Sequence, residues 1–129
     1  MDLDEYLLRK NCSPKITAFM VDIDAFLMSL PGVVREFAQS KKLGVLPRDV
    51  HYRKGNNSIF FYVRPQKTSL LVEVPVNIEN LKCVFVHSLG IKDVSSWFHN
   101  QPYISFNVRE GTSFDLLKEF LTFLYEEQD

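Results

Sequence analysis

The chain has 129 residues, of which 46% are hydrophobic and 13% aromatic, and its formal net charge is −1. This composition excludes a generally disordered protein, and the length fits one domain, residues 1–129, with its own core. No apolar run reaches the ~18 residues that a membrane-spanning helix needs, and the acidic start MDLDEYLLRK lacks the layout of a signal peptide. The sequence therefore predicts a cytoplasmic protein that makes no contact with a membrane.

Two helices are predicted at the N-terminal end from their start signals. Asp2 is a candidate N-cap for a short helix over residues 3–10, and Ser13 followed by Pro14 is typical of a second start. Apolar residues then recur at helical spacing until Pro31-Gly32 ends the helix. This stripe consists of Ile16, Phe19, Met20, Ile23, Phe26, Leu27 and Leu30.

The segment 33–44 has two interpretations. Its apolar residues fit a third helix that stops at Gly44, with two lysines in its last turn. The β-branched pair Val33-Val34 also suits the start of a strand. We predict the helix and keep the strand as the alternative.

From residue 50 onward, the spacing of apolar residues changes to the alternation that is typical of strands. Residues 50–54, 58–64 and 69–76 predict an antiparallel meander with turns at Gly55-Asn56-Asn57 and at residues 65–68.

In the last third of the chain, some segments have apolar residues at helical spacing and others at the spacing of strands. Residues 83–86 fit a strand or a helix, and Asp93 is a candidate cap for a helical turn that contains Trp97. Residues 103–108 predict a strand, and Ser113 starts a closing helix. The predicted fold class is α+β, with an antiparallel four- to five-stranded sheet, N-terminal helices and a C-terminal helix packed mainly on one face.

Charge is unevenly distributed along the chain. Residues 31–72 carry eight basic and two acidic residues, a net charge of +6, whereas residues 73–129 carry four basic and nine acidic residues, a net charge of −5. A basic middle segment can form an anion-binding face, or it can be an ordinary set of solvated strand ends and loops.

No catalytic signature is present. The sequence lacks a phosphate-binding loop, a nucleophile elbow and the Glu-x-Lys strand of a restriction-type nuclease, so we predict no catalytic residues and no cofactor. The two cysteines are expected to be small buried hydrophobic residues. The residues Cys83, His87, His99 and His51 could bind zinc in principle, but their spacing matches no standard site, so no metal site is predicted.

A strand with a basic end, an aromatic strand and a Pro-Gln-Lys turn follow one another from Tyr52 to Leu70. With the later strand YISFNV and the closing helix, residues 48–126 resemble an uncharacterised bacterial domain family, found alone or fused to the C-termini of restriction-type nucleases and predicted transport proteins. Residues 31–47 would be an insertion, and the family's His-Trp-Gly-like loop would correspond to residues 96–99. The resemblance implies no catalytic residues and a link to nucleic acid through neighbouring domains.

The strand SIFFYVR, residues 58–64, has apolar residues on both predicted faces. Alternation places Phe60, Tyr62 and Arg64 together, opposite Ile59, Phe61 and Val63. If helices cover only the second face, the first is an aromatic and basic platform for bases and phosphates. If helices cover both faces, Phe60 and Tyr62 lie in a second small core.

We predict a non-catalytic binding module associated with DNA or RNA through this basic and aromatic face. The alternative is a protein-interaction or assembly domain whose aromatic face meets a partner chain. The candidate nucleic-acid-binding residues are Arg53, Lys54, Phe60, Tyr62, Arg64, Lys67 and Trp97, with Tyr103 and Asn107 on the same predicted face.

Overall fold

The computed structural model describes residues 1–38, 44–94 and 102–128. The helices in this part of the chain are α1 (Leu3–Arg9), α2 (Pro14–Ser29), α3 (Cys83–Ser88) and α4 (Phe114–Glu126), with a 3-10 turn η1 (Ile78–Asn80) before α3. The strands are β1 (Val33–Phe37), β2 (Val50–Lys54), β3 (Ile59–Pro65), β4 (Leu70–Val74), β5 (Lys92–Val94) and β6 (Tyr103–Val108).

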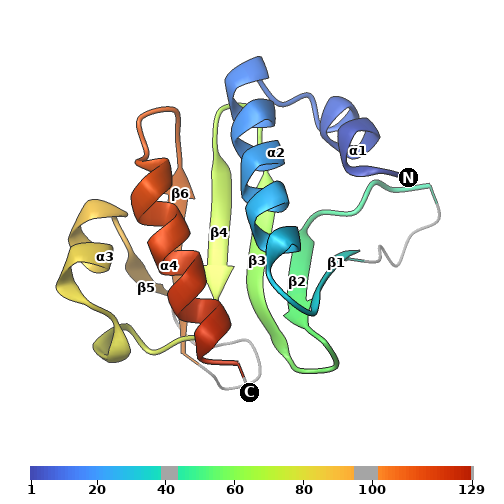
Figure 1. The fold of residues 1–129 in the computed structure, drawn as a ribbon. Helices are drawn as coiled ribbons and strands as arrows, with labels where there is room; N and C mark the ends of the chain where they lie inside the picture. Colours follow the sequence, from blue (N-terminus) through green and yellow to red (C-terminus); the bar gives the residue numbers. More distant parts are fainter. Residues whose placement is uncertain (39–43, 95–101, 129) are drawn as a thin grey trace.

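The strands form one antiparallel sheet in the order β1-β2-β3-β4-β6-β5. Figure 1 shows α2 and α4 lying side by side in front of this sheet. The shorter helices extend the same layer, because Tyr6 of α1 contacts Phe37 of β1 and Phe85 of α3 contacts Phe120 of α4. The predicted α+β class, with helices mainly on one face of an antiparallel sheet, is confirmed, although six strands replace the expected four or five.

Helices α1, α2 and α4 each begin directly after the capping residue predicted for them. The Asp2 carboxylate accepts a hydrogen bond from the Glu5 N–H, and the Ser13 hydroxyl accepts one from Ile16. At the start of α4 the Ser113 hydroxyl accepts from the Leu116 N–H. Each side chain satisfies a backbone donor that the first turn of a helix leaves free, so these starts are fixed by local sequence.

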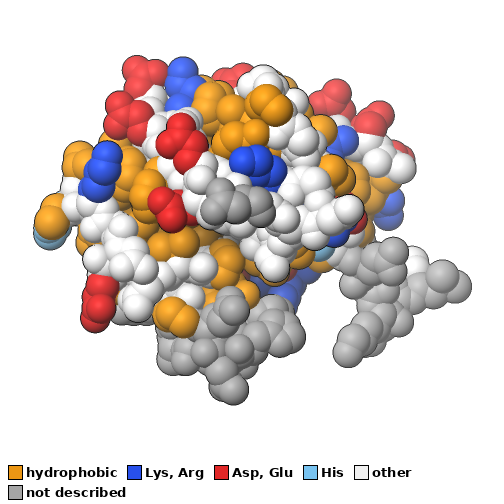
Figure 2. Space-filling model, turned by 60° about the horizontal axis from the view of Figure 1, so that its bottom comes forward, with side chains coloured by type: hydrophobic (Ala, Val, Ile, Leu, Met, Phe, Trp, Pro, Cys, Tyr) orange, Lys and Arg blue, Asp and Glu red, His pale blue; other side chains and the backbone are white. Residues whose placement is uncertain are grey.

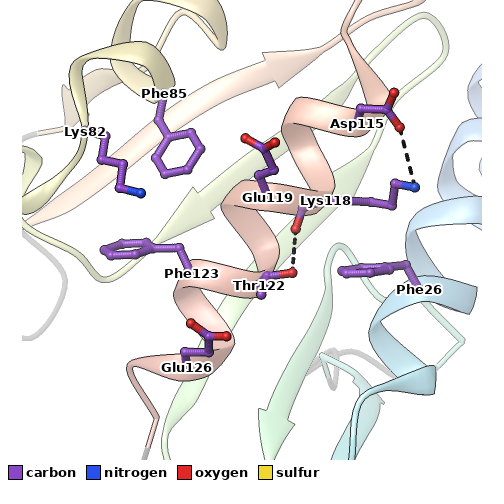
Figure 3. A pocket seen from close by; sticks show the side chains of 9 residues that line it. All are labelled: Phe26, Lys82, Phe85, Asp115, Lys118, Glu119, Thr122, Phe123 and Glu126. Atoms are coloured by element: carbon purple, nitrogen blue, oxygen red, sulfur yellow. Dashed lines mark hydrogen bonds and ion pairs between the residues drawn. The ribbon is translucent and has the colours of Figure 1, made fainter.

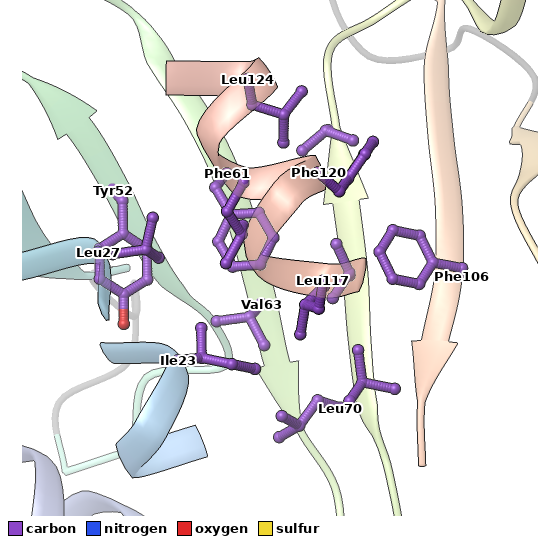
Figure 4. Packing of buried hydrophobic residues seen from close by; sticks show 14 of the residues in the cluster. Ile23, Leu27, Tyr52, Phe61, Val63, Leu70, Phe106, Leu117, Phe120 and Leu124 are labelled. Carbon is purple, nitrogen blue, oxygen red and sulfur yellow. The ribbon is translucent and has the colours of Figure 1, made fainter. Parts of the chain in front are cut away.

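The hydrophobic core lies between the helix layer and the sheet (Figure 4). The helices contribute one buried residue per turn, because apolar residues recur at a spacing of three and four along their inner sides. Those of α2 are Ile16, Met20, Ile23 and Leu27, and those of α4 are Leu117, Phe120, Leu121 and Leu124. The sheet contributes Tyr52, Phe61, Val63, Leu70 and Phe106, among others.

Two aromatic residues of the predicted α2 stripe lie at the edge of this core. Phe19 and Phe26 are half-buried, whereas Ile23 between them is fully buried. They are seven residues apart, so both project from the same flank of the helix, toward α4, where Phe19 contacts Phe114 at 5.6 Å between ring centroids. Phe26, although part of the apolar stripe, therefore packs against the edge of the core instead of lying in its fully buried centre.

The predicted helix over residues 33–44 is also wrong. Val33–Phe37 forms the edge strand β1, which pairs with β2 over its whole length. Gly32, with φ at +78°, turns the chain directly after α2, and the valines that follow favour extended backbone. The strand alternative for this segment is the correct one.

The segment between β4 and β6 contains a helix and a strand. Residues 83–88 form α3, which settles the ambiguity in favour of a helix. Asp93 and Val94 belong to strand β5, and the helical turn predicted after Asp93 falls mainly on residues 95–101, outside the described part of the chain. Trp97 lies outside the described residues. Cys12 is half-buried and Cys83 is exposed, both as free thiols, so the expectation of two buried cysteines is wrong.

Candidate binding face

The sheet face opposite the helices is defined by the pairing of the strands. One row of paired residues crosses all six strands, from Glu36 on β1 to Lys92 on β5, whereas Val50, Val63 and Val72 of the neighbouring row are fully buried on the side of α2 and α4. Because side chains alternate along each strand, the first row must point away from the helices. Its residues, together with alternate neighbours, form what we call the outer face: Val34, Glu36, His51, Arg53, Tyr62, Arg64, Leu71, Glu73, Lys92, Tyr103, Ser105 and Asn107.

A bulge removes Phe60 from this face. Tyr52 pairs with Phe61 and Arg53 pairs with Ile59, so Phe60 is the extra residue on β3. It is 1% exposed, and its ring contacts Tyr125 of α4 on the helix side. A bulge lets two successive side chains point to the same face, so the predicted grouping of Phe60 with Tyr62 is wrong. Tyr62 itself is half-buried on the outer face.

Arg53 is paired with a carboxylate on the adjacent strand. Its Nη2 donates a hydrogen bond of 2.9 Å to Glu36 Oε2, and its Nε lies 2.8 Å from Oε1. The Arg53 Nε–H is not aligned for a hydrogen bond with any described atom. Its contact with Glu36 Oε1 is therefore electrostatic only. Glu36 Oε1 is also 3.4 Å from His51 Nε2. Burial lowers the pKa of His51, which Glu36 opposes only in part.

Arg64 is held between two further carboxylates. Its Nε donates to Asp49 Oδ1 at 2.9 Å, and its Nη2 is 3.6 Å from Glu73 Oε1. Asp49 also lies 3.5 Å from the Arg48 Nε. Asp49 is only 8% exposed, and its charge is compensated by Arg64, which is hydrogen-bonded to it, and by the more distant Arg48.

Two tyrosines lie at the centre of the outer face. The rings of Tyr62 and Tyr103 are 6.3 Å apart between centroids, and the His51 ring meets Tyr62 edge-on at 5.9 Å. The two phenols share a hydrogen bond. Burial raises the pKa of Tyr62 to about 12, with smaller contributions from Tyr103 and from the carboxylates of Asp49 and Glu73.

The remaining predicted site residues do not join this group. Lys54 Nζ donates to the Gln128 carbonyl at 2.9 Å and lies 4.3 Å from the ring centroid of Tyr125, on the helix side. Lys67 is exposed in the turn before β4. Figure 2 views the molecule from below and from the helix side, with the outer face turned away, and shows Lys and Arg side chains on that side as separate blue spots. The outer face thus contains Arg53, Tyr62 and Arg64 from the predicted set, with Tyr103 and Asn107 as expected from alternation.

The carboxylates are the part of this face that the sequence interpretation missed. Glu36 fell in the segment taken for a helix, and Asp49 comes just before a predicted strand. Glu73 was detectable, because it alternates with Val72 and Val74 in LLVEV and sits directly opposite Tyr62. The result is a face on which aromatic rings are surrounded by arginines already paired with acidic residues.

The raised phenol pKa values predict a loss of stability at alkaline pH. An unfolded tyrosine titrates near pH 10, whereas Tyr62 in the folded chain titrates at about 12. The folded state therefore favours the protonated phenol: its contribution to stability is complete below pH 10 and is lost as the pH rises toward 12. Chemical denaturation at pH 9 to about 11.5 should show this decline, and Tyr62→Phe should make it shallower. Identical pH profiles for the two proteins would contradict the assignment.

No family model, curated protein or solved structure matches this chain. The resemblance of residues 48–126 to a bacterial domain family therefore stays a prediction. None of the described helices is long and apolar enough to cross a membrane. Within residues 1–38, 44–94 and 102–128, no three His, Cys, Asp or Glu side chains come close enough together to hold a metal ion, and His99 lies outside these ranges.

Proposed function

We propose that this chain is a non-catalytic binding module whose outer face binds a partner protein. The observation that carries the proposal is the pairing of Arg53 with Glu36 and of Arg64 with Asp49 and Glu73. An arginine that is paired with a carboxylate contributes little net positive potential to the surface. The net positive charge of residues 31–72 is therefore a weak argument for phosphate binding on the outer face.

The composition of the face supports a protein partner. Tyrosine and arginine are the residue types most enriched among the residues that dominate binding energy at protein interfaces. Tyr62 and Tyr103 supply large rings of limited flexibility, and the ion pairs hold the surrounding side chains in fixed positions. Pre-ordered side chains lose less entropy when a partner binds, which favours affinity.

The second candidate function is binding of single-stranded DNA or RNA, the leading expectation from sequence. It is favoured by one observation, the adjacency of the Tyr62 and Tyr103 rings on a sheet face that also carries Arg53 and Arg64. Bases stack on exposed aromatic rings, and each such contact contributes ~1–3 kcal/mol. This function would require the arginines to exchange their carboxylate partners for phosphates. A cytoplasmic location belongs to both proposals and is supported by the two free thiols, since disulfides are typical of oxidising compartments.

The protein-binding proposal can be tested by recovering partners from an extract of cells that make this protein. The immobilised wild type and Tyr62→Ala are compared after nuclease treatment and a wash at about 0.5 M salt, which weakens phosphate contacts. We expect a protein that the wild type retains and that Tyr62→Ala binds roughly 30-fold more weakly, as for an interface residue worth about 2 kcal/mol.

Two further variants make this comparison specific. Leu8→Ala changes a residue of α1 that is 81% exposed and far from the sheet face, and it should retain the partner. Ser105→Arg places a bulky charge on the outer face without removing a core side chain, and it should lose the partner even if Tyr62→Ala proves unstable. Equal retention by all variants, or retention that nuclease abolishes, would contradict the proposal.

A further inference from the structure

Lys10, at the end of α1, is a half-buried cation that has no anionic partner among the described residues. Its Nζ lies over the face of the Tyr6 ring, 5.7 Å from the centroid. Every other half-buried lysine or arginine in the described part of the chain has an oxygen partner, and Figure 3 shows one such pair, Lys118 with Asp115 of α4. The remaining pairs are Arg35 with Asp24, Arg53 with Glu36, Arg64 with Asp49, and Lys54 with the Gln128 carbonyl. A charge removed from water is normally paired, so the Lys10 ammonium group indicates a place for an anion.

Tyr6 fixes a second cation close to Lys10. The Tyr6 hydroxyl donates to the Pro47 carbonyl at 2.8 Å and to the Arg48 carbonyl at 3.2 Å. These contacts join α1 to the segment that leads into β2, which runs below α1 in Figure 1. Because Tyr6 is fully buried, they hold the backbone of Arg48 in place, although its side chain is 69% exposed. One tyrosine thus positions both cations, Lys10 against its ring and Arg48 at its hydroxyl.

Positive charge exceeds negative charge at this corner of the fold. Asp49 accepts a hydrogen bond from Arg64 at 2.9 Å and lies 3.5 Å from the Arg48 Nε, and Glu73 lies 3.6 Å from Arg64. The three cations Lys10, Arg48 and Arg64 therefore share two carboxylates, which leaves an excess of one positive charge. The Arg48 guanidinium makes no hydrogen bond to a described residue, so its N–H donors are available to a ligand.

The two available cations match a doubly charged phosphate group. A guanidinium presents parallel N–H donors that fit two phosphate oxygens, and an ammonium group adds a compact point charge. A terminal phosphate carries a charge of about −1.5 to −2 at pH 7. A phosphodiester of a nucleic acid carries a single charge, and its binding depends on many such contacts along the strand. Two cations at one corner therefore suit a terminal phosphate better.

We propose that Lys10 and Arg48 form a binding site for a doubly charged phosphate group, either free phosphate or the terminal phosphate of a larger molecule. The phosphate takes the place of the missing counter-charge of Lys10 and accepts hydrogen bonds from Arg48, while Arg64 stays paired with Asp49. Neither Lys10 nor Arg48 belongs to the outer face. The site is therefore independent of the protein partner proposed above.

The ionisation of Lys10 supplies a direct readout of binding. Burial lowers the pKa of Lys10, Asp49 and Cys12 oppose this shift, and the charges of Arg64 and Arg48 add to it. A bound anion favours the charged ammonium group, so phosphate should raise the pKa of Lys10. NMR titration of the lysine side chains measures this pKa with and without ligand, and the amide signals of α1 and Arg48 report the affinity.

The probes are inorganic phosphate, O-phosphoserine and a nucleoside monophosphate, each added to the full chain at about pH 7.5, where the phosphate is mostly doubly charged. Dimethyl phosphate, which carries one charge, is the control. We expect the doubly charged probes to bind with a Kd of roughly 1 mM and dimethyl phosphate to bind about tenfold more weakly. Tighter binding of inorganic phosphate would identify free phosphate as the ligand, and tighter binding of an ester would identify the larger molecule.

Matched variants separate this site from general attraction of anions. Lys10→Met and Arg48→Gln keep the length of the side chain but remove its charge, and each should weaken phosphate binding by about tenfold. Lys92→Met makes the same change in total charge on β5, at the other edge of the sheet, and should bind like the wild type. Arg48→Lys keeps the charge and should lose only about threefold. Equal affinities of Lys10→Met and Lys92→Met, equal binding of dimethyl phosphate, or an unchanged pKa of Lys10 would overturn the proposal.

Discussion

Replacing Phe120 with alanine is expected to lower the free energy of unfolding by about 3–5 kcal/mol. Phe120 is fully buried and contacts the rings of Phe85 and Phe106 edge-on, at 5.3 and 5.5 Å between centroids. Truncation would remove the contact that joins α4 to both α3 and β6, and would leave a cavity that neighbouring helices and strands cannot close fully. Denaturant unfolding followed by circular dichroism measures the change.

Phe26→Ala is the matched control for this prediction. Both substitutions remove a phenylalanine ring from a long helix of the same layer, but Phe26 is only half-buried, at the edge of the core. We therefore expect a loss of only about 1–2 kcal/mol. Equal losses for the two variants would mean that α2 is rotated relative to the arrangement described here.

Replacing Asp24 with alanine is the second change with a large expected effect, a loss of about 2–4 kcal/mol. The Asp24 carboxylate accepts a hydrogen bond from the Tyr52 hydroxyl at 2.8 Å and pairs with Arg35 at 2.9 Å. It thereby ties α2 to β1 and β2. Tyr52 is fully buried, so its hydroxyl would lose its only acceptor among the described residues, and Arg35 would lose its counter-charge.

Asp22→Ala provides the comparison for Asp24→Ala. The two aspartates lie two residues apart on α2, and this spacing points them to different sides of the helix. Asp22 is exposed, and its replacement should change the free energy of unfolding by less than about 0.5 kcal/mol. A small effect of Asp24→Ala in the same denaturation experiment would contradict the role assigned to the Tyr52–Asp24–Arg35 contacts.

Local signals allowed most elements to be predicted from sequence. The caps at Asp2, Ser13 and Ser113 act within three residues, and the inner stripes of α2 and α4 depend only on helical period. The meander β2-β3-β4 was also predictable, since its turn at Gly55 requires a positive φ of +60° that glycine adopts without strain. These features could be predicted correctly because residues close in the sequence are enough to specify them.

The errors arose where distant partners decide the structure. Residues 33–37 have a pattern compatible with helix and strand, and only their pairing with β2 fixes the outcome. The bulge at Phe60 depends on register with Tyr52 and Arg53, so simple alternation assigned the ring to the wrong face. In the same way, a count of basic residues over 31–72 could not reveal that Arg53 and Arg64 would pair with acidic residues, one of them on a strand that was kept only as the alternative to a helix.

An antiparallel sheet can have a helix layer on one face only, and none of the described helices covers the outer face of this sheet (Figure 1). That face is a half-buried, ion-paired surface rather than a plainly polar one. On this face Tyr62 is half-buried and Tyr103 is only 8% exposed, and Arg53 and Arg64 are paired with carboxylates of the same fold. If the arginines are occupied in this way, they are poor phosphate ligands, and a protein partner is the better match.

The pairing of these arginines can be tested through the salt dependence of nucleic-acid binding. Anisotropy of labelled single-stranded DNA and RNA oligonucleotides is measured with the wild type and Arg64→Gln from about 0.05 to 0.2 M salt, a range over which phosphate contacts weaken steeply. We predict no specific binding at low salt and no difference between the two proteins. A measurable affinity that falls steeply with salt, with a slope that Arg64→Gln reduces by about 0.7, would show that Arg64 contacts phosphate and would contradict a protein-binding outer face.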